Sequence, residues 1–331
     1  DRIDGPLPIN LVYERRRNKS ETFSAGLNLT DANFTLPGFE WTKAAGKRAT
    51  AEIAVLMKDG EITAIPDLRI DAGALKATVK GTFSPGKKGT HRGLSAPEIG
   101  AGSAVLETLE IKSFILDKTS FSATLHRAAD RSFVIDVSGS GFNAAQFISQ
   151  NLGGIDALDL PAFRLTGNFG RFWIGEGDPA NNMRMELKRD AHRWQRVVAE
   201  AALPKSGQSI SIKMLPTLEG HILEIYSADA GYLLKALEVT NTIRTGIIEI
   251  NGAREGGPNA PWRGVAEMKR FRVADAPTFA RLLSLASFTG FNDIISGKGI
   301  AFSRLAFPYF FQNGVAKIVE ARAVGSELGI T

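Results

Sequence analysis

Few residues of this chain have the types and spacing that catalysis or metal binding requires. The four histidines are scattered singly, and none has a second histidine or a carboxylate at a spacing that would form a metal site. The sequence contains no cysteine, which excludes disulfides, thiolate metal sites and cysteine nucleophiles. We therefore expect no metal and no cofactor. The histidines are His91, His126, His192 and His221.

Three short segments resemble parts of catalytic sites without completing one. Segment 139–141 (Gly-Ser-Gly) lacks the remainder of a nucleophile elbow, and segment 297–299 (Gly-Lys-Gly) lacks the remainder of a phosphate-binding loop. Asp156 and Asp159 are close in sequence, but such carboxylates are common in loops and at helix caps. We expect no catalytic residue, and hence no enzymatic activity.

The bulk composition is that of a folded protein with a mild positive charge. Apolar residues make up 44% of the 331 residues and charged residues 23%, which argues against disorder. Because the 35 acidic residues are spread among the 40 basic ones, no face is predicted to be basic enough to bind nucleic acid. No apolar run is long enough for a membrane-spanning helix, and no signal peptide opens the chain. Its abrupt ends favour a piece of a longer protein.

The elements that would position any site are mostly short strands. Apolar and polar residues alternate at 75–83, 121–126, 133–137 and 183–187, so each of these strands has one apolar face. Further strands are predicted at 9–15, 22–29 and 51–57, with tight hairpin turns at Asp59-Gly60 and Asn313-Gly314. Segment 85–104 is polar and rich in Gly and Pro, which is typical of a long loop. We count roughly twenty strand candidates.

Three short helices interrupt the strands and form an internal repeat. SADAGYLLKAL (227–237) aligns without gaps on VADAPTFARLL (273–283), and GFNAAQFISQNL (141–152) is a weaker third copy. Each copy places an Asp or Asn where a helix N-cap is needed, namely Asp229, Asp275 and Asn143. Repeated strand-plus-helix units favour stacking in one direction.

A strand with one apolar face must cover that face with something. The face can pack against a second sheet, giving a pair of β-sandwiches, or the sheet can curl around itself or a ligand. Alternation alone leaves these alternatives open, and with them the choice between an ordinary core and an open groove.

The C-terminal part of the chain resembles a known family. Segments ADAPTFARLLSLASFTG, SGKGIAFSRL and QNGVAKIVEARAVGSELGIT are similar to the C-terminal region of AsmA-like proteins of the YhdP/TamB type. The similarity is close over residues 264–331 and, elsewhere, one of pattern only. It implies an elongated, curled antiparallel β-sheet around a lipid-holding groove. It also implies the periplasm of a Gram-negative bacterium and an inner-membrane anchor in a segment outside this chain.

We therefore expect a lipid-binding or lipid-transfer module with three segments, 1–140, 141–263 and 264–331. Its partners would be phospholipids, the inner and outer membrane surfaces and other envelope proteins. The alternative is a structural module that assists outer-membrane protein assembly through exposed strand edges. The side chains expected to line the lipid groove are Leu75, Val79, Phe83, Phe121, Leu125, Phe133, Ile135, Val137, Met183, Met185, Leu187, Ile210, Ile212 and Met214.

Overall fold

The computed structural model describes residues 3–17, 19–36, 38–39, 41–85, 104–151, 160–191, 193–257, 260–274, 299–325 and 329–330. The protein is mainly β, with 67% of residues in strands and 4% in helices, which confirms the predicted fold class. Several predicted features lie outside the described residues: the helix after Asp275, most of the 85–104 loop, the pair Asp156 and Asp159, and His91 and His192. None of the helices in the described ranges is long and apolar enough to cross a membrane.

The chain separates into two compact units. The first comprises Asp1–Gln146, Asp159–Gly170 and Lys188–His192, and the second Phe147–Leu158, Arg171–Leu187 and Arg193–Thr331. Three elements have residues in both units: α1 (Ala145–Asn151), β12 (Phe163–Trp173) and β13 (Ala180–Arg189). The three sequence segments proposed above stay a prediction.

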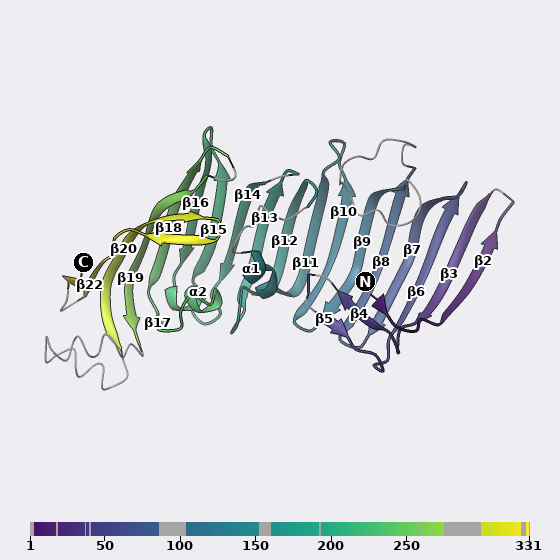
Figure 1. The fold of residues 1–331 in the computed structure, drawn as a ribbon, viewed down its shortest axis with the longest axis horizontal. Helices are drawn as coiled ribbons and strands as arrows, with labels where there is room; N and C mark the ends of the chain where they lie inside the picture. The colour runs from purple at the N-terminus through teal and green to yellow at the C-terminus, as the bar shows by residue number, and fades with distance from the viewer. Residues whose placement is uncertain are drawn as a thin grey trace. The chain divides into compact units, whose positions relative to one another are not determined.

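The first unit contains one large antiparallel sheet with the order β2-β3-β6-β7-β8-β9-β10-β11 (Figure 1). A small sheet, β1-β4-β5, lies at one end of its strands. The bounds are β1 Ile3–Asp4, β2 Ile9–Arg15, β3 Ser20–Asn28, β4 Asn33–Leu36, β5 Trp41–Lys43, β6 Thr50–Lys58, β7 Glu61–Ala72, β8 Leu75–Ser84, β9 Val105–Leu116, β10 Thr119–Arg127 and β11 Phe133–Asn143.

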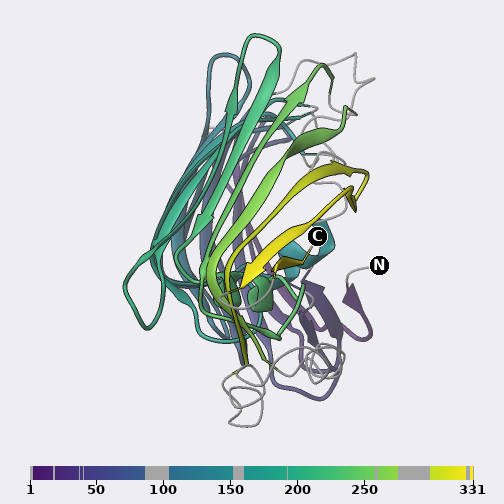
Figure 2. The same ribbon diagram turned by 90° about the vertical axis from the view of Figure 1, so that its left-hand side faces the viewer.

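The second unit contains an antiparallel sheet with the order β14-β15-β16-β18-β19-β20, and its strands bend along their length, so the sheet is curled (Figure 2). Short strands extend it, since β17 pairs with β19, β21 and β22 pair with β20, and β23 pairs with β22. The bounds are β14 Trp194–Ala202, β15 Ser209–Pro216, β16 Gly220–Ser227, α2 Ala230–Ala236, β17 Ile243–Arg244, β18 Ile247–Glu255, β19 Trp262–Val273, β20 Ile300–Gln312, β21 Val315–Ile318, β22 Arg322–Gly325 and β23 Gly329–Ile330.

Turns and caps form where the sequence predicts them. A two-residue hairpin turn of this type requires positive φ at both residues. The φ angles are 51° and 81° in Asp59-Gly60, and 52° and 78° in Asn313-Gly314. Asp229 caps α2, because its side chain accepts a hydrogen bond of 3.0 Å from the Tyr232 N–H. Asn143 accepts one of 3.2 Å from the Ala145 N–H at the start of α1. Within the described residues the protein therefore has two of the three expected helices.

Candidate functional site

One face of the large sheet in the first unit is apolar across all eight strands. Strand registers place one residue from each strand in a continuous row, in which each residue is directly opposite the next. The row is Leu11, Ala25, Ile53, Leu68, Val79, Ile111, Ala123 and Val137. We call this row the middle row and the surface that contains it the first apolar face.

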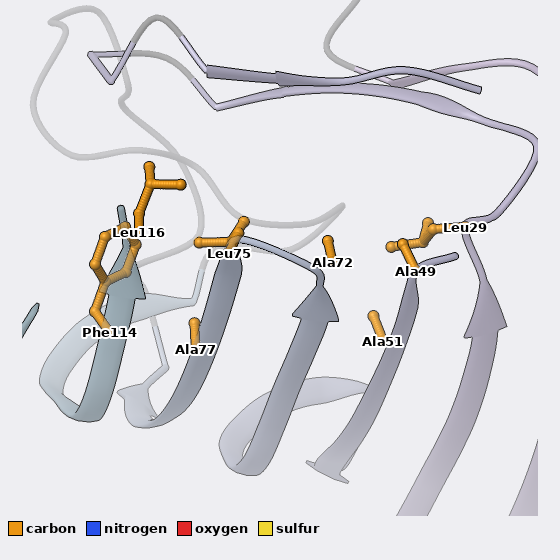
Figure 3. Packing of buried hydrophobic residues seen from close by; sticks show 8 residues of the cluster. All are labelled: Leu29, Ala49, Ala51, Ala72, Leu75, Ala77, Phe114 and Leu116. Atoms are coloured by element: carbon orange, nitrogen blue, oxygen red, sulfur yellow. The ribbon is translucent and has the colours of Figure 1, made fainter. Parts of the chain in front are cut away.

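A neighbouring row lies toward the small sheet, three residues further along β9 and two residues further along each of the other strands. Its members are Ile9, Leu27, Ala51, Ile70, Ala77, Phe114, Phe121 and Gly139. Part of this row belongs to a buried cluster with Leu29, Ala49, Ala72, Leu75 and Leu116 (Figure 3). Side chains of the small sheet, Phe34, Leu36 and Trp41, pack against the cluster. This end of the first apolar face is therefore an ordinary core.

Aromatic rings continue this buried end from strand to strand. The Phe114 ring stacks on Phe121 with centroids 4.9 Å apart and lies 5.0 Å from Phe39. Phe121 contacts Phe142 at 6.1 Å, and Phe142 contacts Phe169 at 5.2 Å. Aromatic contacts of this kind fix the end of the sheet where the strands meet the small sheet.

Lys43 ties the small sheet to the large one. Its ammonium group donates hydrogen bonds to the carbonyl oxygens of Leu29 at 2.5 Å, Thr30 at 2.5 Å and Ala32 at 2.9 Å. Only 4% of the residue is exposed, so all three donors of the ammonium are used in a site that water scarcely reaches.

The middle row is not covered in the same way. Seven of its members, from Ala25 to Val137, are half-buried, and Leu11 at the edge is 61% exposed. Facing sheets in a sandwich would bury these side chains almost completely. The first apolar face is thus closed at the small sheet and open along its middle.

The opposite face of the same sheet is polar. Lys80 contacts Glu110 at 2.7 Å, Lys76 contacts Asp71 at 3.0 Å, and the hydroxyls of Thr82 and Thr108 are 2.6 Å apart. Two shallow hollows lie on this side, one near Arg69 and Lys76 and the other near Glu110 and Asp136. Most of the residues that line them are polar or charged, and both hollows are open to solvent, which does not suit an apolar ligand. His126 is exposed, as its place on the polar face of its strand predicted.

The second unit repeats this arrangement on its own sheet. Three rows cross β14, β15, β16, β18, β19 and β20 and form the second apolar face. They are Ala201-Ile210-Ser227-Ile248-Met268-Leu305, Ala199-Ile212-Ile225-Ile250-Ala266-Phe307 and Val197-Met214-Leu223-Gly252-Gly264-Tyr309. In the middle of the three, every residue from Ala199 to Ile250 is half-buried.

Tyr309 lies in the third of these rows and is buried. It lies beside two glycines in register, and a Cβ on Gly252 would come within 2.3 Å of its hydroxyl oxygen. The tyrosine side chain therefore occupies space that a larger residue at position 252 would need. Burial raises the pKa of the Tyr309 phenol above its ordinary value.

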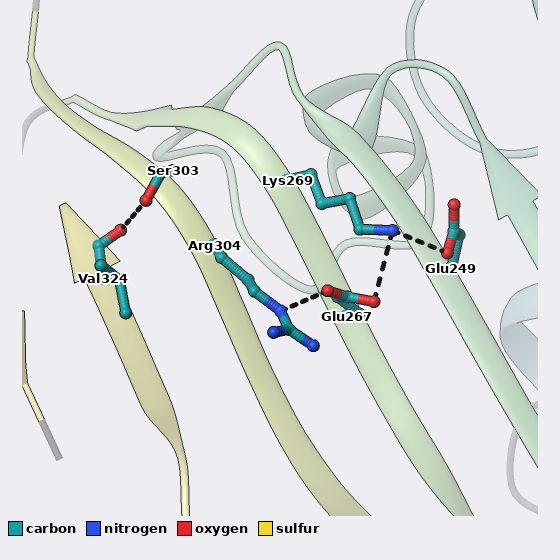
Figure 4. A network of polar contacts seen from close by, with 6 residues as sticks. All are labelled: Glu249, Glu267, Lys269, Ser303, Arg304 and Val324. Atoms are coloured by element: carbon teal, nitrogen blue, oxygen red, sulfur yellow. Dashed lines mark hydrogen bonds and ion pairs between the residues drawn. The ribbon is translucent and has the colours of Figure 1, made fainter. Parts of the chain in front are cut away.

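Charged residues occupy the opposite face of the second sheet (Figure 4). Glu249 and Glu267 are opposite each other on β18 and β19. Lys269 contacts Glu249 at 3.2 Å and Glu267 at 3.3 Å, and Arg304 donates to Glu267 from β20. On the neighbouring strand β22, the Val324 carbonyl accepts a hydrogen bond of 2.8 Å from the Ser303 hydroxyl. This face is held by polar contacts rather than by packing.

The predicted groove residues fall into two sets, one in each unit. In the first unit, registers place Val79, Phe121, Leu125, Ile135 and Val137 on the first apolar face. The alternation on the same strands adds Leu75, Phe83 and Phe133, of which Leu75 and Phe133 are buried. In the second unit, Ile210, Ile212 and Met214 belong to the second apolar face. Met183, Met185 and Leu187 alternate along β13, with Met183 buried.

Sequence reasoning missed Leu109, Ile111 and Phe114 of β9. The pairing of β8 with β9 shifts register between Thr78 and Val79. As a result, Ile111 and Phe114 lie on the same face of the sheet although two residues of β9, Lys112 and Ser113, separate them. A period of two therefore fails on this strand. Ile248 and Ile250 of β18 were also missed, although their clean alternation is a signal that could have found them.

Comparisons with known proteins add no relative. No protein-family model matches the chain, and neither a curated protein nor a solved structure matches it. Among the described residues, no three His, Asp or Glu side chains gather closely enough to hold a metal ion. The two apolar faces are therefore the candidate functional sites.

Proposed function

We propose that the chain is a lipid-binding and lipid-transfer module of the AsmA-like type, in which phospholipid acyl chains lie on the apolar faces. The middle row carries this proposal, because it joins eight apolar residues from eight strands, of which seven are only half-buried and Leu11 is 61% exposed. Removing an acyl CH₂ group from water contributes about 0.8 kcal/mol, so a chain lying along the row would be held by contact with apolar side chains alone.

Each sheet has one apolar face and one polar face, and this arrangement suits a ligand that is itself part apolar and part polar. Acyl chains would contact the apolar side, while the headgroup would stay in water beyond the apolar rows. This binding mode requires no catalytic group and no cofactor. The proposed setting is the bacterial periplasm, where such a module would contribute to phospholipid transport from the inner to the outer membrane and to envelope integrity.

Native mass spectrometry of the purified chain, followed by organic extraction and lipid identification, tests this function. We expect phospholipid to remain bound under gentle conditions and to be released by organic solvent. An apo mass in every preparation, together with no binding of added phospholipid, would count against the proposal. A neutral fluorophore such as N-phenyl-1-naphthylamine provides a second readout of apolar surface that is independent of the headgroup.

One observation favours the alternative, a module that works through protein contacts. Strand β2 lies at an edge of the first sheet, and all seven of its residues are exposed. An exposed edge strand can add a further strand from another polypeptide. The two functions are compatible, since the strand edge and the apolar face are different surfaces of the sheet.

A further inference from the structure

Strand β2 is an edge without the usual protection. Among the described pairings it contacts β3 alone. Its large apolar side chains are largely exposed, with Ile9 at 55%, Leu11 at 61% and Val12 at 58%. Edge strands in natural proteins commonly carry a proline, a lysine or a bulge that blocks further pairing, and Ile9–Arg15 contains none of these. Its two charges, Glu14 and Arg15, lie together at the end.

The hydrogen bonds at both ends of the β2-β3 hairpin show which backbone groups face outward. The Arg16 N–H donates to the Ser20 carbonyl at 2.9 Å, and the Asn28 N–H donates to the Pro8 carbonyl at 3.0 Å. In an antiparallel pair, bonded and non-bonded positions alternate. Even-numbered residues from Asn10 to Glu14 therefore bond to β3. The N–H and C=O groups of Ile9, Leu11, Tyr13 and Arg15 point to the open edge.

We propose that β2 pairs antiparallel with β2 of a second copy of this chain, with a twofold axis at Val12. This is the one register in which all four outward-facing residues of each copy pair with one another. It places Leu11 opposite Tyr13 of the second copy, and Ile9 opposite Arg15. Symmetric, self-complementary contacts of this kind are the commonest way in which identical chains associate.

The side chains are compatible with this register on both faces. Asn10 is opposite Glu14 of the second copy and Val12 is opposite Val12, so no two like charges face each other. The Tyr13 ring contacts the Phe23 ring, with centroids 4.7 Å apart. In the proposed dimer the edge of the Tyr13 ring would contact the second copy's Leu11. The side chains thus permit the register that the backbone selects.

Pairing would also join the first apolar faces of the two copies. Ile9, Leu11 and Tyr13 belong to that face through their register with Leu27, Ala25 and Phe23. Opposite residues of antiparallel strands project to the same side of the sheet. The middle row of one copy would therefore continue, through Leu11 and the second copy's Tyr13, onto the apolar face of the other. This inference is independent of lipid binding, since the pairing uses the strand edge alone.

Sedimentation of the full chain over a concentration series tests the association. A single strand pair lies at the small end of interface sizes, so we expect a dimer at about 100 µM that dissociates on dilution. Leu11→Pro removes an outward N–H without removing a bond to β3, and should yield a monomer with unchanged circular dichroism. Leu11→Val keeps the N–H and should still dimerise. A monomer at every concentration for the unsubstituted chain would overturn the proposal.

Cysteine cross-linking tests the register, because the natural chain has no cysteine. Val12→Cys places two thiols in a non-hydrogen-bonded pair with Cα atoms about 4.5 Å apart, which suits a disulfide. Asn10→Cys places the two cysteines about 13 Å apart along the strands, beyond disulfide reach. We expect oxidation to cross-link the first variant and leave the second monomeric in denaturing gels. Equal cross-linking of both, or of neither, would contradict this pairing even if phospholipid binds.

Discussion

Glu249 and Glu267 lie directly opposite each other on β18 and β19, and Lys269 holds both carboxylates, at 3.2 and 3.3 Å. Two like charges at paired positions of a sheet would repel each other. Burial, the largest single influence, acts to raise the pKa of Glu267, but hydrogen bonds from Arg304 and Lys269 outweigh it and hold that pKa below its ordinary value of 4.5. The same carboxylates raise the pKa of Lys269, mainly through its hydrogen bond to Glu249.

Lys269→Met should raise the pKa of Glu267, because the two carboxylates then face each other with only Arg304 beside them. A carboxylate with a lowered pKa stabilises the fold above its ordinary pKa, and this contribution is lost as the pH falls through the lowered value. The variant should therefore lose less stability on acidification than the natural chain. Carbon-detected NMR titration of Glu267 measures the shift. Lys205→Met is the control, because the Lys205 side chain is 89% exposed. An unchanged Glu267 pKa in Lys269→Met would contradict the prediction.

Val79→Asp should abolish lipid binding by placing a charge in the middle row. An acyl chain lying over the carboxylate would remove it from water without a partner, so we expect at least ~10-fold weaker binding. Because Val79 is only half-buried, the empty protein should still fold. Thr78→Asp is the matched control, since Thr78 is the adjacent residue and points to the polar face opposite Arg69. Equal phospholipid retention by the two variants in native mass spectrometry would place the lipid elsewhere.

Lys43→Met should destabilise the first unit. The substitution keeps the apolar stem but removes the donor from the buried Ala32 carbonyl, and it leaves the Leu29 carbonyl with only the Ala32 N–H at 3.2 Å. We expect a loss of about 1–3 kcal/mol in the free energy of unfolding, measured with urea. The exposed Lys47→Met should change it by less than about 0.5 kcal/mol. A loss no larger in Lys43→Met than in this control would mean that water replaces the ammonium.

Tyr232→Phe should flatten the alkaline decline in stability of the second unit. Burial, and then the negative charge of Asp178, raise the pKa of Tyr232 to about 12, while its hydroxyl donates to the Asp178 carbonyl at 3.1 Å. A phenol with a raised pKa contributes stability that is complete below its ordinary pKa of 10 and is lost as the pH rises toward 12. Unfolding free energies from pH 8 to 12 measure this. Parallel curves for the variant and the natural chain would contradict the assignment.

Local patterns predicted the strands well because each strand contacts mainly its sequence neighbours. Strand β2 was predicted at 9–15 and forms at Ile9–Arg15, and β8 extends the predicted 75–83 by one residue. Alternation identified the apolar residues of β8, β10 and β11. It failed on β9, because a register shift depends on how β9 fits β8 and cannot be read from β9 alone.

Features that depend on distant segments were not predictable from the sequence. Lysine is usually a surface residue, and nothing in the sequence around Lys43 predicts that it is buried. It is buried because the small sheet places it beside the carbonyls of Leu29 and Ala32. The degree to which an apolar side chain is exposed could not be predicted either. Val79 and Ala77 lie on the same face of β8, yet Ala77 is buried near the small sheet and Val79 is only half-buried. An alternating pattern specifies which side of a strand is apolar, but not what covers that side.

The middle row also bears on how a bound molecule would move. The row runs across the strands, so a ligand travelling along it would pass from one strand to the next in steps of about 4.8 Å. In the centre of the row it would exchange one aliphatic neighbour for another of similar size, from Leu68 to Val79 to Ile111. Because neighbouring positions would bind the ligand about equally well, the barriers between them would be low and no position would hold it tightly. The ligand could then diffuse along the row in either direction. Net direction would then be set by supply and removal at the two ends.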